Sequence, residues 1–171
     1  QVMSKENKII ESWTVNAATW IKAIDTCAIE SRKLITNKAI IDAVTNSKPS
    51  SILDVGCGEG WLAGELQKKG IAVTGVDAVP ALIENAKQKV EGDFFVATYE
   101  DIADGKINFA NLFDAIVINF ALIGKESTEN LLKALPRFLA PNGKLIIQTL
   151  HPYSRKALGD YFTGWKVGSW D

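Results

Sequence analysis

Three glycines alternate at Gly56, Gly58 and Gly60. Glycine adopts backbone angles closed to other residues and has no side chain to keep a ligand away from the backbone. A short apolar run precedes these glycines, and a helical pattern resumes at Trp61. A helix that follows such a turn directs free N–H groups and the positive end of its dipole toward the turn. The stretch therefore predicts a strand, a turn and a helix that bind a polar, nucleotide-like ligand.

A carboxylate ends the next apolar run, at Asp77, 21 positions after Gly56. A carboxylate at the end of the second strand can accept hydrogen bonds from both hydroxyls of a ribose whose other end lies over a glycine turn. The alternative is that Asp77 caps the helix beginning at Pro80. The spacing and the preceding apolar strand favour ribose binding.

The glycine spacing also bears on which nucleotide binds. A dinucleotide fingerprint needs G-x-G-x-x-G, because its third glycine lets the helix pack close to the strand. Trp61 stands at the place of that third glycine. A bulky indole there disfavours a pyrophosphate cofactor, and a nicotinamide-dependent oxidoreductase becomes the least favoured function.

His151 is the only histidine of the chain and follows the last predicted strand, with Tyr153 two positions later. A neutral imidazole can take a proton near pH 7, so His151 is a candidate general base. Tyr153 is a weaker candidate for orienting a substrate. The alternative is that His151 fixes the loop before Pro152, since no partner carboxylate is evident in the sequence.

Short apolar runs alternate with longer amphipathic ones after residue 50, and the first fifty residues carry three segments of helical periodicity. Strands that are apolar nearly throughout and alternate with helices indicate a parallel sheet covered on both faces, a doubly wound, Rossmann-like α/β fold. Ligands of such sheets bind beyond the carboxyl ends of the strands. The predicted strands are 51–55, 72–76, 94–97, 113–119 and 144–149, and the predicted helices after residue 50 are 61–69, 80–89 and 128–139.

Four segments, in order, resemble the motifs of class I S-adenosylmethionine-dependent methyltransferases, and the resemblance runs from residue 51 to 149. It implies the strand order 3-2-1-4-5 and S-adenosylmethionine as the cofactor. The family normally completes its sheet with strands 6 and 7, which no sequence here can supply, so the resemblance also implies a truncated chain. The segments are 53–60, 73–77, 113–119 and 139–145.

The resemblance implies a place for individual residues around the cofactor. The family often has an acidic residue where this chain has Thr98, so Glu100 or Asp101 would serve the amino group of adenine instead. Carried over position by position, the residues are Asp54, Gly56, Cys57 and Gly58 for the methionine part, Asp77 and Ala78 for the ribose, Thr98, Tyr99 and Glu100 for the adenine, and Asn119, Phe120 and Ala121 beneath the sulfonium.

Arg32 resembles, in placement, an arginine that ubiquinone-type O-methyltransferases have ahead of the first motif and that pairs with the carboxylate of the cofactor. The fork-shaped guanidinium suits a carboxylate geometrically. The alternative, a solvated arginine on a helix, stays open because the intervening spacing is not identical.

The totals fit one domain of 171 residues with 47% apolar and 23% charged residues. We expect an N-terminal helical segment (1–50), a cofactor-binding core (51–150) and an aromatic-rich tail (151–171). A formal charge of −1 offers no broad attraction to nucleic acid or to anionic membranes, which favours a small-molecule partner. The two cysteines lack metal-site spacing, and the chain has neither a leader nor a membrane-spanning run. These features predict a soluble, cytoplasmic protein.

The expected reaction is displacement of a methyl group from a sulfonium by an oxygen, nitrogen or carbon nucleophile of a small molecule. Because the cofactor carries an excellent leaving group, the protein mainly aligns the reactants and excludes water. The sequence does not identify the acceptor or the oligomeric state. A protein that binds S-adenosylmethionine without catalysis is the alternative.

Overall fold

Five strands form one sheet in the computed structural model, which describes residues 5–151. The strands are β1 (Ser51–Val55), β2 (Ala72–Asp77), β3 (Asp93–Val96), β4 (Phe113–Asn119) and β5 (Leu139–Gln148). They lie in the order β3-β2-β1-β4-β5, and each neighbouring pair is parallel. The predicted doubly wound fold and strand order are therefore confirmed. The direction of winding reverses between β1 and β4, which is where such sheets bind ligands.

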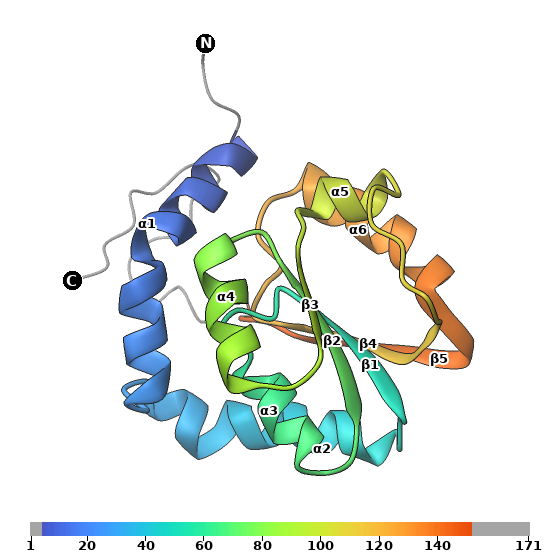
Figure 1. Cartoon of the computed structure of the whole chain (residues 1–171), viewed down its shortest axis with the longest axis horizontal. Helices are drawn as coiled ribbons and strands as arrows, with labels where there is room; N and C mark the ends of the chain where they lie inside the picture. The colour runs from blue at the N-terminus through green and yellow to red at the C-terminus, as the bar shows by residue number, and fades with distance from the viewer. Residues whose placement is uncertain (1–4, 152–171) are drawn as a thin grey trace.

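Apolar side chains of the strands alternate between two clusters, one on each face of the sheet. In β1, Ile52 belongs to one cluster and Leu53 to the other, because successive side chains of a strand point to opposite faces. Helices cover both faces (Figure 1), so the strand ends are left for a ligand. One face carries α2 (Asn37–Asn46), α3 (Trp61–Gln67) and α4 (Pro80–Lys89), and the other carries α5 (Tyr99–Ala103) and α6 (Glu126–Ala134).

The N-terminal part begins with one long helix, α1 (Lys5–Asp25), which joins the first two of the three helical segments predicted for the first fifty residues. A π-helix, η1 (Arg32–Thr36), then leads directly into α2. Helix α1 lies beside α4 in Figure 1 and packs on it through Ala17, which meets Val79 and Leu82 in a small apolar cluster of their own. This packing carries the side chains of α1 over the carboxyl ends of the strands.

Two elements, α6 and β5, differ most from their predicted bounds, while β2, β3 and α3 differ by one or two residues. Helix α6 begins at Glu126 and ends at Ala134, well before residue 139, because Pro136 cannot continue the helical hydrogen bonds and a 3-10 turn, η2 (Leu135–Phe138), follows. Strand β5 begins at Leu139 rather than at residue 144, and an irregularity in its pairing with β4 accommodates the extra residues. Helix α5 was not predicted at all. It is short, and its capping residues rather than its periodicity define it.

Candidate functional site

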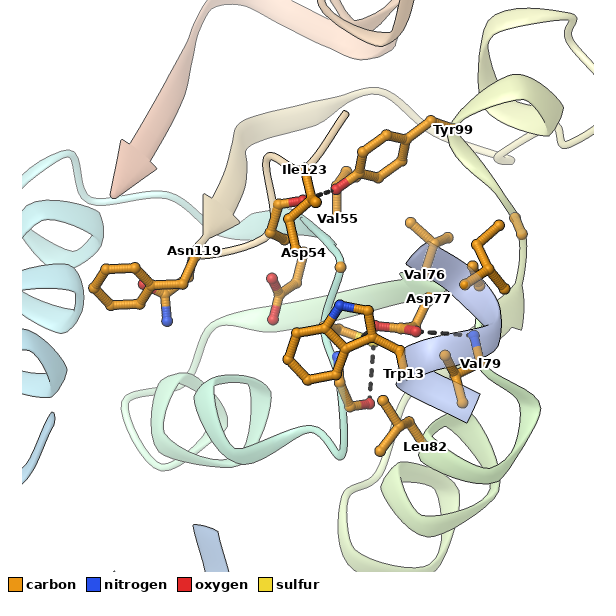
Figure 2. Close-up of a pocket in the computed structure, with 18 of the residues that line it drawn as sticks. Trp13, Asp54, Val55, Val76, Asp77, Val79, Leu82, Tyr99, Asn119 and Ile123 are labelled. Atoms are coloured by element: carbon orange, nitrogen blue, oxygen red, sulfur yellow. Dashed lines mark hydrogen bonds between the residues drawn. The ribbon is translucent and has the colours of Figure 1, made fainter. Parts of the chain in front are cut away.

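A cavity lies at the carboxyl ends of β1, β2 and β4, between the glycine turn and helix α1 (Figure 2). Most of the residues predicted for cofactor binding line it, although they come from η1, from α5 and from three strands with the loops that follow them. The lining includes Trp13 and Trp20 of α1, Arg32 of η1, Asp54, Gly56, Cys57, Gly58, Glu59 and Trp61 around the glycine turn, Asp77 and Ala78 after β2, Tyr99 and Glu100 of α5, and Asn119, Phe120 and Ala121 after β4.

The glycine turn uses the conformational freedom of glycine at each of the three positions. Gly56, Gly58 and Gly60 have φ angles of 76°, 56° and 84°, in the region that side chains with a Cβ rarely adopt. Gly56 also needs its small size, because a Cβ built on it would collide with the Cβ of Ala121 in the loop after β4. The turn and that loop therefore approach each other closely beneath the cavity.

Asp77 holds the glycine turn and the start of α4 in place. Its Oδ2 accepts a hydrogen bond from the backbone N–H of Gly58 over 3.0 Å, and its Oδ1 accepts one from Val79 over 2.9 Å. Burial raises the pKa of Asp77, and these hydrogen bonds oppose the rise. A carboxylate offers about four lone-pair sites, so each oxygen can still accept from a ligand. The ribose role and the local structural role are thus compatible.

Asp54 is a buried carboxylate with an oxygen that lacks a partner. The residue is 1% exposed at the end of β1, and its Oδ2 has no hydrogen-bond partner within the described residues. Burial raises the pKa of Asp54 to about 7, and the negative charges of Asp77 and Glu59 add to the rise. A buried carboxylate among other carboxylates is stabilised by a cation. The position fits the amino group that the prediction assigned to it.

Arg32 lies between two tryptophan rings at the cavity wall. The carbon of its guanidinium is 5.4 Å from the ring centroid of Trp20 and 4.7 Å from that of Trp61, distances typical of cation–π contacts. Its Nε donates to Oδ1 of Asn37 over 3.3 Å, while its Nη2 is buried and has no acceptor among residues 5–151. Burial lowers the pKa of Arg32, and Glu59 opposes this. The side chain is not a solvated surface arginine, and Nη2 is available to a ligand.

A hydrogen bond that the sequence did not predict joins α1 to the glycine turn. The indole Nε1 of Trp20 donates to Oε2 of Glu59 over 2.8 Å, although the two residues are 39 positions apart. Glu59 is 3% exposed, and burial raises its pKa while the Trp20 bond and Arg32 lower it. Glu59 stands between two of the alternating glycines, but no local pattern pairs it with a residue of a distant helix.

The segment predicted to clasp adenine divides into two parts. Thr98 and Asp101 form a capping box at the start of α5, in which each side chain accepts a hydrogen bond from the backbone N–H of the other. Neither residue lines the cavity, whereas Tyr99 and Glu100 do. The Tyr99 hydroxyl donates to the carbonyl of Ala121 across the cavity. Of the two carboxylates considered for the adenine amino group, Glu100 is therefore the one that faces the cavity.

Only one of the two residues proposed for catalysis lies within the described residues, and it does not line the cavity. His151 follows β5, is exposed, and is not among the residues that line the cavity. Tyr153 lies outside the described residues. No group of three or more histidine, cysteine, aspartate or glutamate side chains is placed to hold a metal within residues 5–151. The roles of His151 and Tyr153 stay predictions.

The family described as "Methyltransferase domain" matches residues 30–168, which is most of the chain. The chain therefore belongs to this methyltransferase family. A methyltransferase of Mycobacterium tuberculosis that is named as uncharacterized is 32% identical over 133 residues, covering 77% of this chain and 64% of that protein. The ubiquinone biosynthesis O-methyltransferase of Xanthomonas oryzae pv. oryzae is 32% identical over 105 residues, covering 58% of this chain and 43% of that protein.

A solved structure supports the same architecture. The plantazolicin methyltransferase BpumL, in complex with a pentazolic desmethylPZN analog and SAH, matches with a TM-score of 0.61 and 21% identity, over 94% of this chain and 68% of that one. At this identity the match concerns the fold. The chain spans 64% of the mycobacterial relative and 43% of the Xanthomonas relative, so it corresponds to part of their length. No helix among residues 5–151 is long and apolar enough to span a membrane.

Proposed function

We propose that the chain binds S-adenosylmethionine and transfers its methyl group to a small-molecule acceptor by direct displacement. The observation that carries the proposal is a pair of opposite, unsatisfied groups in one cavity. Asp54 has an unpaired buried oxygen, and Arg32 has an unpaired buried donor. The amino acid part of S-adenosylmethionine has both an ammonium and a carboxylate, which complement these two groups. The glycine turn lets the ligand approach the backbone closely, and Asp77 offers a carboxylate to the ribose hydroxyls of a nucleoside.

Different lining residues can bind different parts of the cofactor. Asp54 would accept from the amino group and Arg32 would donate to the carboxylate. Asp77 retains lone pairs for the ribose hydroxyls, and Glu100 would accept from the adenine amino group beside Tyr99. Membership of the methyltransferase domain family supports this assignment.

The cofactor, when bound, supplies a methyl group activated by a sulfonium. The chain itself must then orient this methyl group and keep water away. Helix α1 contributes apolar and aromatic side chains to the cavity, including Ile9, Ile10 and Trp13, which suit the exclusion of water. The residues from Asn119 to Ala121 also line the cavity. His151, which follows β5 outside this lining, is proposed as a general base where the acceptor requires one.

The proposed acceptor is a small molecule. Two observations support this class: the chain carries no excess of positive charge, and the lining of the cavity includes the apolar side chains of Ile9, Ile10 and Ile123. The Xanthomonas relative is named for ubiquinone biosynthesis, and BpumL was solved with a plantazolicin analog. Binding of the cofactor without methyl transfer is the alternative.

Titration calorimetry with S-adenosylhomocysteine and with NAD tests the proposal. We expect saturable binding of S-adenosylhomocysteine and none of NAD at the same concentrations. Binding of NAD alone would overturn the assignment. Transfer of radiolabelled methyl groups from S-adenosylmethionine to a panel of phenols, amines and thiols then separates the enzyme from the non-catalytic binder.

A further inference from the structure

One glutamine joins the two strand ends beside the cavity to the π-helix. Gln148 ends β5, and its Nε2 donates to Oδ1 of Asn119, at the end of β4, over 2.7 Å. The same Nε2 donates to the backbone carbonyl of Thr36 over 3.1 Å. Thr36 is the last residue of η1, which begins at Arg32. A single side chain therefore contacts both the strand end that carries Asn119 and the helix that carries Arg32.

The carbonyl of Thr36 determines which way both side-chain amides face. A backbone carbonyl can only accept, so the atom of Gln148 beside it must be the nitrogen. The same nitrogen lies beside Asn119, so the Asn119 atom that meets it must be the oxygen. Side-chain amides are otherwise free to be placed either way round, and here a backbone group removes the ambiguity. Nδ2 of Asn119 is then the group left to donate.

The backbone of Gln148 supports the same wall of the cavity. Its carbonyl accepts a hydrogen bond from the N–H of Phe120 over 2.7 Å. Phe120 has a φ angle of 54°, in the left-handed region, where a residue with a large side chain is strained. Gln148 therefore holds both the backbone after Asn119 and the amide of Asn119 itself, and Asn119 and Phe120 both line the cavity.

We propose that Gln148 is a positioning residue that holds the Asn119 amide as a hydrogen-bond donor to the carboxylate of the bound cofactor. The inference rests on the proposed function. In the methionine part of S-adenosylmethionine the carboxylate oxygens are the strong acceptors, whereas the ammonium and the sulfonium are cationic. Asn119 and the unpaired Nη2 of Arg32 would then donate to one carboxylate from two elements that Gln148 connects.

A double-mutant cycle on S-adenosylhomocysteine affinity tests this role. Gln148→Met keeps the length of the side chain and removes the donor, while Gln148→Lys keeps a donor that can reach both oxygens. Each is made in the wild-type chain and in Asn119→Ala, and a melting curve checks that each variant folds. We expect Gln148→Met to weaken binding about tenfold, the size of one lost hydrogen bond to a charged group. Gln148→Lys should stay within about threefold of wild type.

In the Asn119→Ala background, Gln148→Met should change the affinity by less than about twofold, because the group through which it acts is gone. A direct charge effect of the lysine would persist in that background, so the cycle separates the two causes. Wild-type affinity in Gln148→Met, equal losses in the Met and Lys variants, or equal losses in both backgrounds would each overturn the inference. If the wild-type chain does not bind S-adenosylhomocysteine, this result contradicts the proposed function, whereas the outcomes above contradict only the role of Gln148.

Discussion

The burial of the Asp54 carboxyl group makes the stability of the ligand-free protein depend on pH. Its carboxyl group keeps its proton in the folded state up to a pH of about 7, compared with 3.8 for an unperturbed carboxyl group. The raised pKa contributes stability that is complete below a pH of about 4 and is lost as the pH rises to about 7. Above that range the folded protein carries an unpaired buried charge.

We therefore expect Asp54→Asn to stabilise the ligand-free protein at pH 8, by up to about 4 kcal/mol. The gain should shrink as the pH is lowered toward 4, and urea denaturation at several pH values measures it. The same variant should bind S-adenosylhomocysteine more weakly, since asparagine offers no charge to an ammonium. A gain in stability that did not depend on pH would contradict the assigned ionisation of Asp54.

Arg32 should contribute to affinity through its free donor. Replacement by alanine removes a cation and its hydrogen bonds, so we expect S-adenosylhomocysteine to bind at least about tenfold more weakly by calorimetry. Lys33→Ala is the matched control, because Lys33 is the next residue of the same π-helix and is exposed. Equal affinities of the two variants for S-adenosylhomocysteine would contradict the proposed contact of Arg32 with the carboxylate.

At the scale of elements, the glycine turn requires glycine at position 56 both for its backbone angles and for its small size. Gly56 and Gly70 have φ angles of 76° and 79°, but only at Gly56 would a Cβ meet another atom, the Cβ of Ala121, at close range. Gly70→Ala should cost about 1–2 kcal/mol from the left-handed backbone alone. Gly56→Ala should cost clearly more in urea denaturation, because the loop after β4 must also move. Equal losses of stability in the two variants would show that the close approach of Gly56 to Ala121 does not affect the free energy of unfolding.

Helix α1 depends on one polar contact with the turn. Trp20→Phe keeps an aromatic ring for Arg32 but removes the donor to Glu59, which leaves a buried carboxylate unsatisfied at a cost of about 1–3 kcal/mol. We expect faster hydrogen exchange of the α1 amides in this variant. Val15→Ala is the control, since Val15 lies on the same helix and is 76% exposed. Unchanged exchange rates in Trp20→Phe would mean that the contacts of α1 with α4, which are the apolar cluster and the ion pair between Asp25 and Lys89, hold α1 without this hydrogen bond.

At the scale of the whole molecule, the cavity connects α1, η1 and three strands, so a ligand that fills it should stabilise all of them together. A concentration of S-adenosylhomocysteine about 100 times its Kd adds about 2.7 kcal/mol to the free energy of unfolding. For a domain of this size that corresponds to a rise in Tm of about 5–10 °C. Differential scanning calorimetry measures the shift. A comparable rise with NAD would argue for a different nucleotide.

The sequence by itself determined the features that depend on neighbouring residues. The alternating glycines, the apolar strands and the carboxylate at Asp77 are local patterns, and they predicted a parallel, doubly wound fold with a nucleotide-like ligand at its strand ends. The resemblance to a known family implied the strand order and the cofactor-binding residues, most of which line the cavity. Boundaries were predicted less well where a single residue outweighed a period, as Pro136 did at the end of α6.

Only the tertiary structure decided which distant side chains meet. Glu59 pairs with Trp20 from 39 positions away, and Gln148 reaches Thr36 from 112 positions away. The pKa of Asp54 likewise depends on burial and on carboxylates from other elements. No local pattern contains such information, because hydrogen-bond direction and desolvation arise only when the strand ends and helices are packed together.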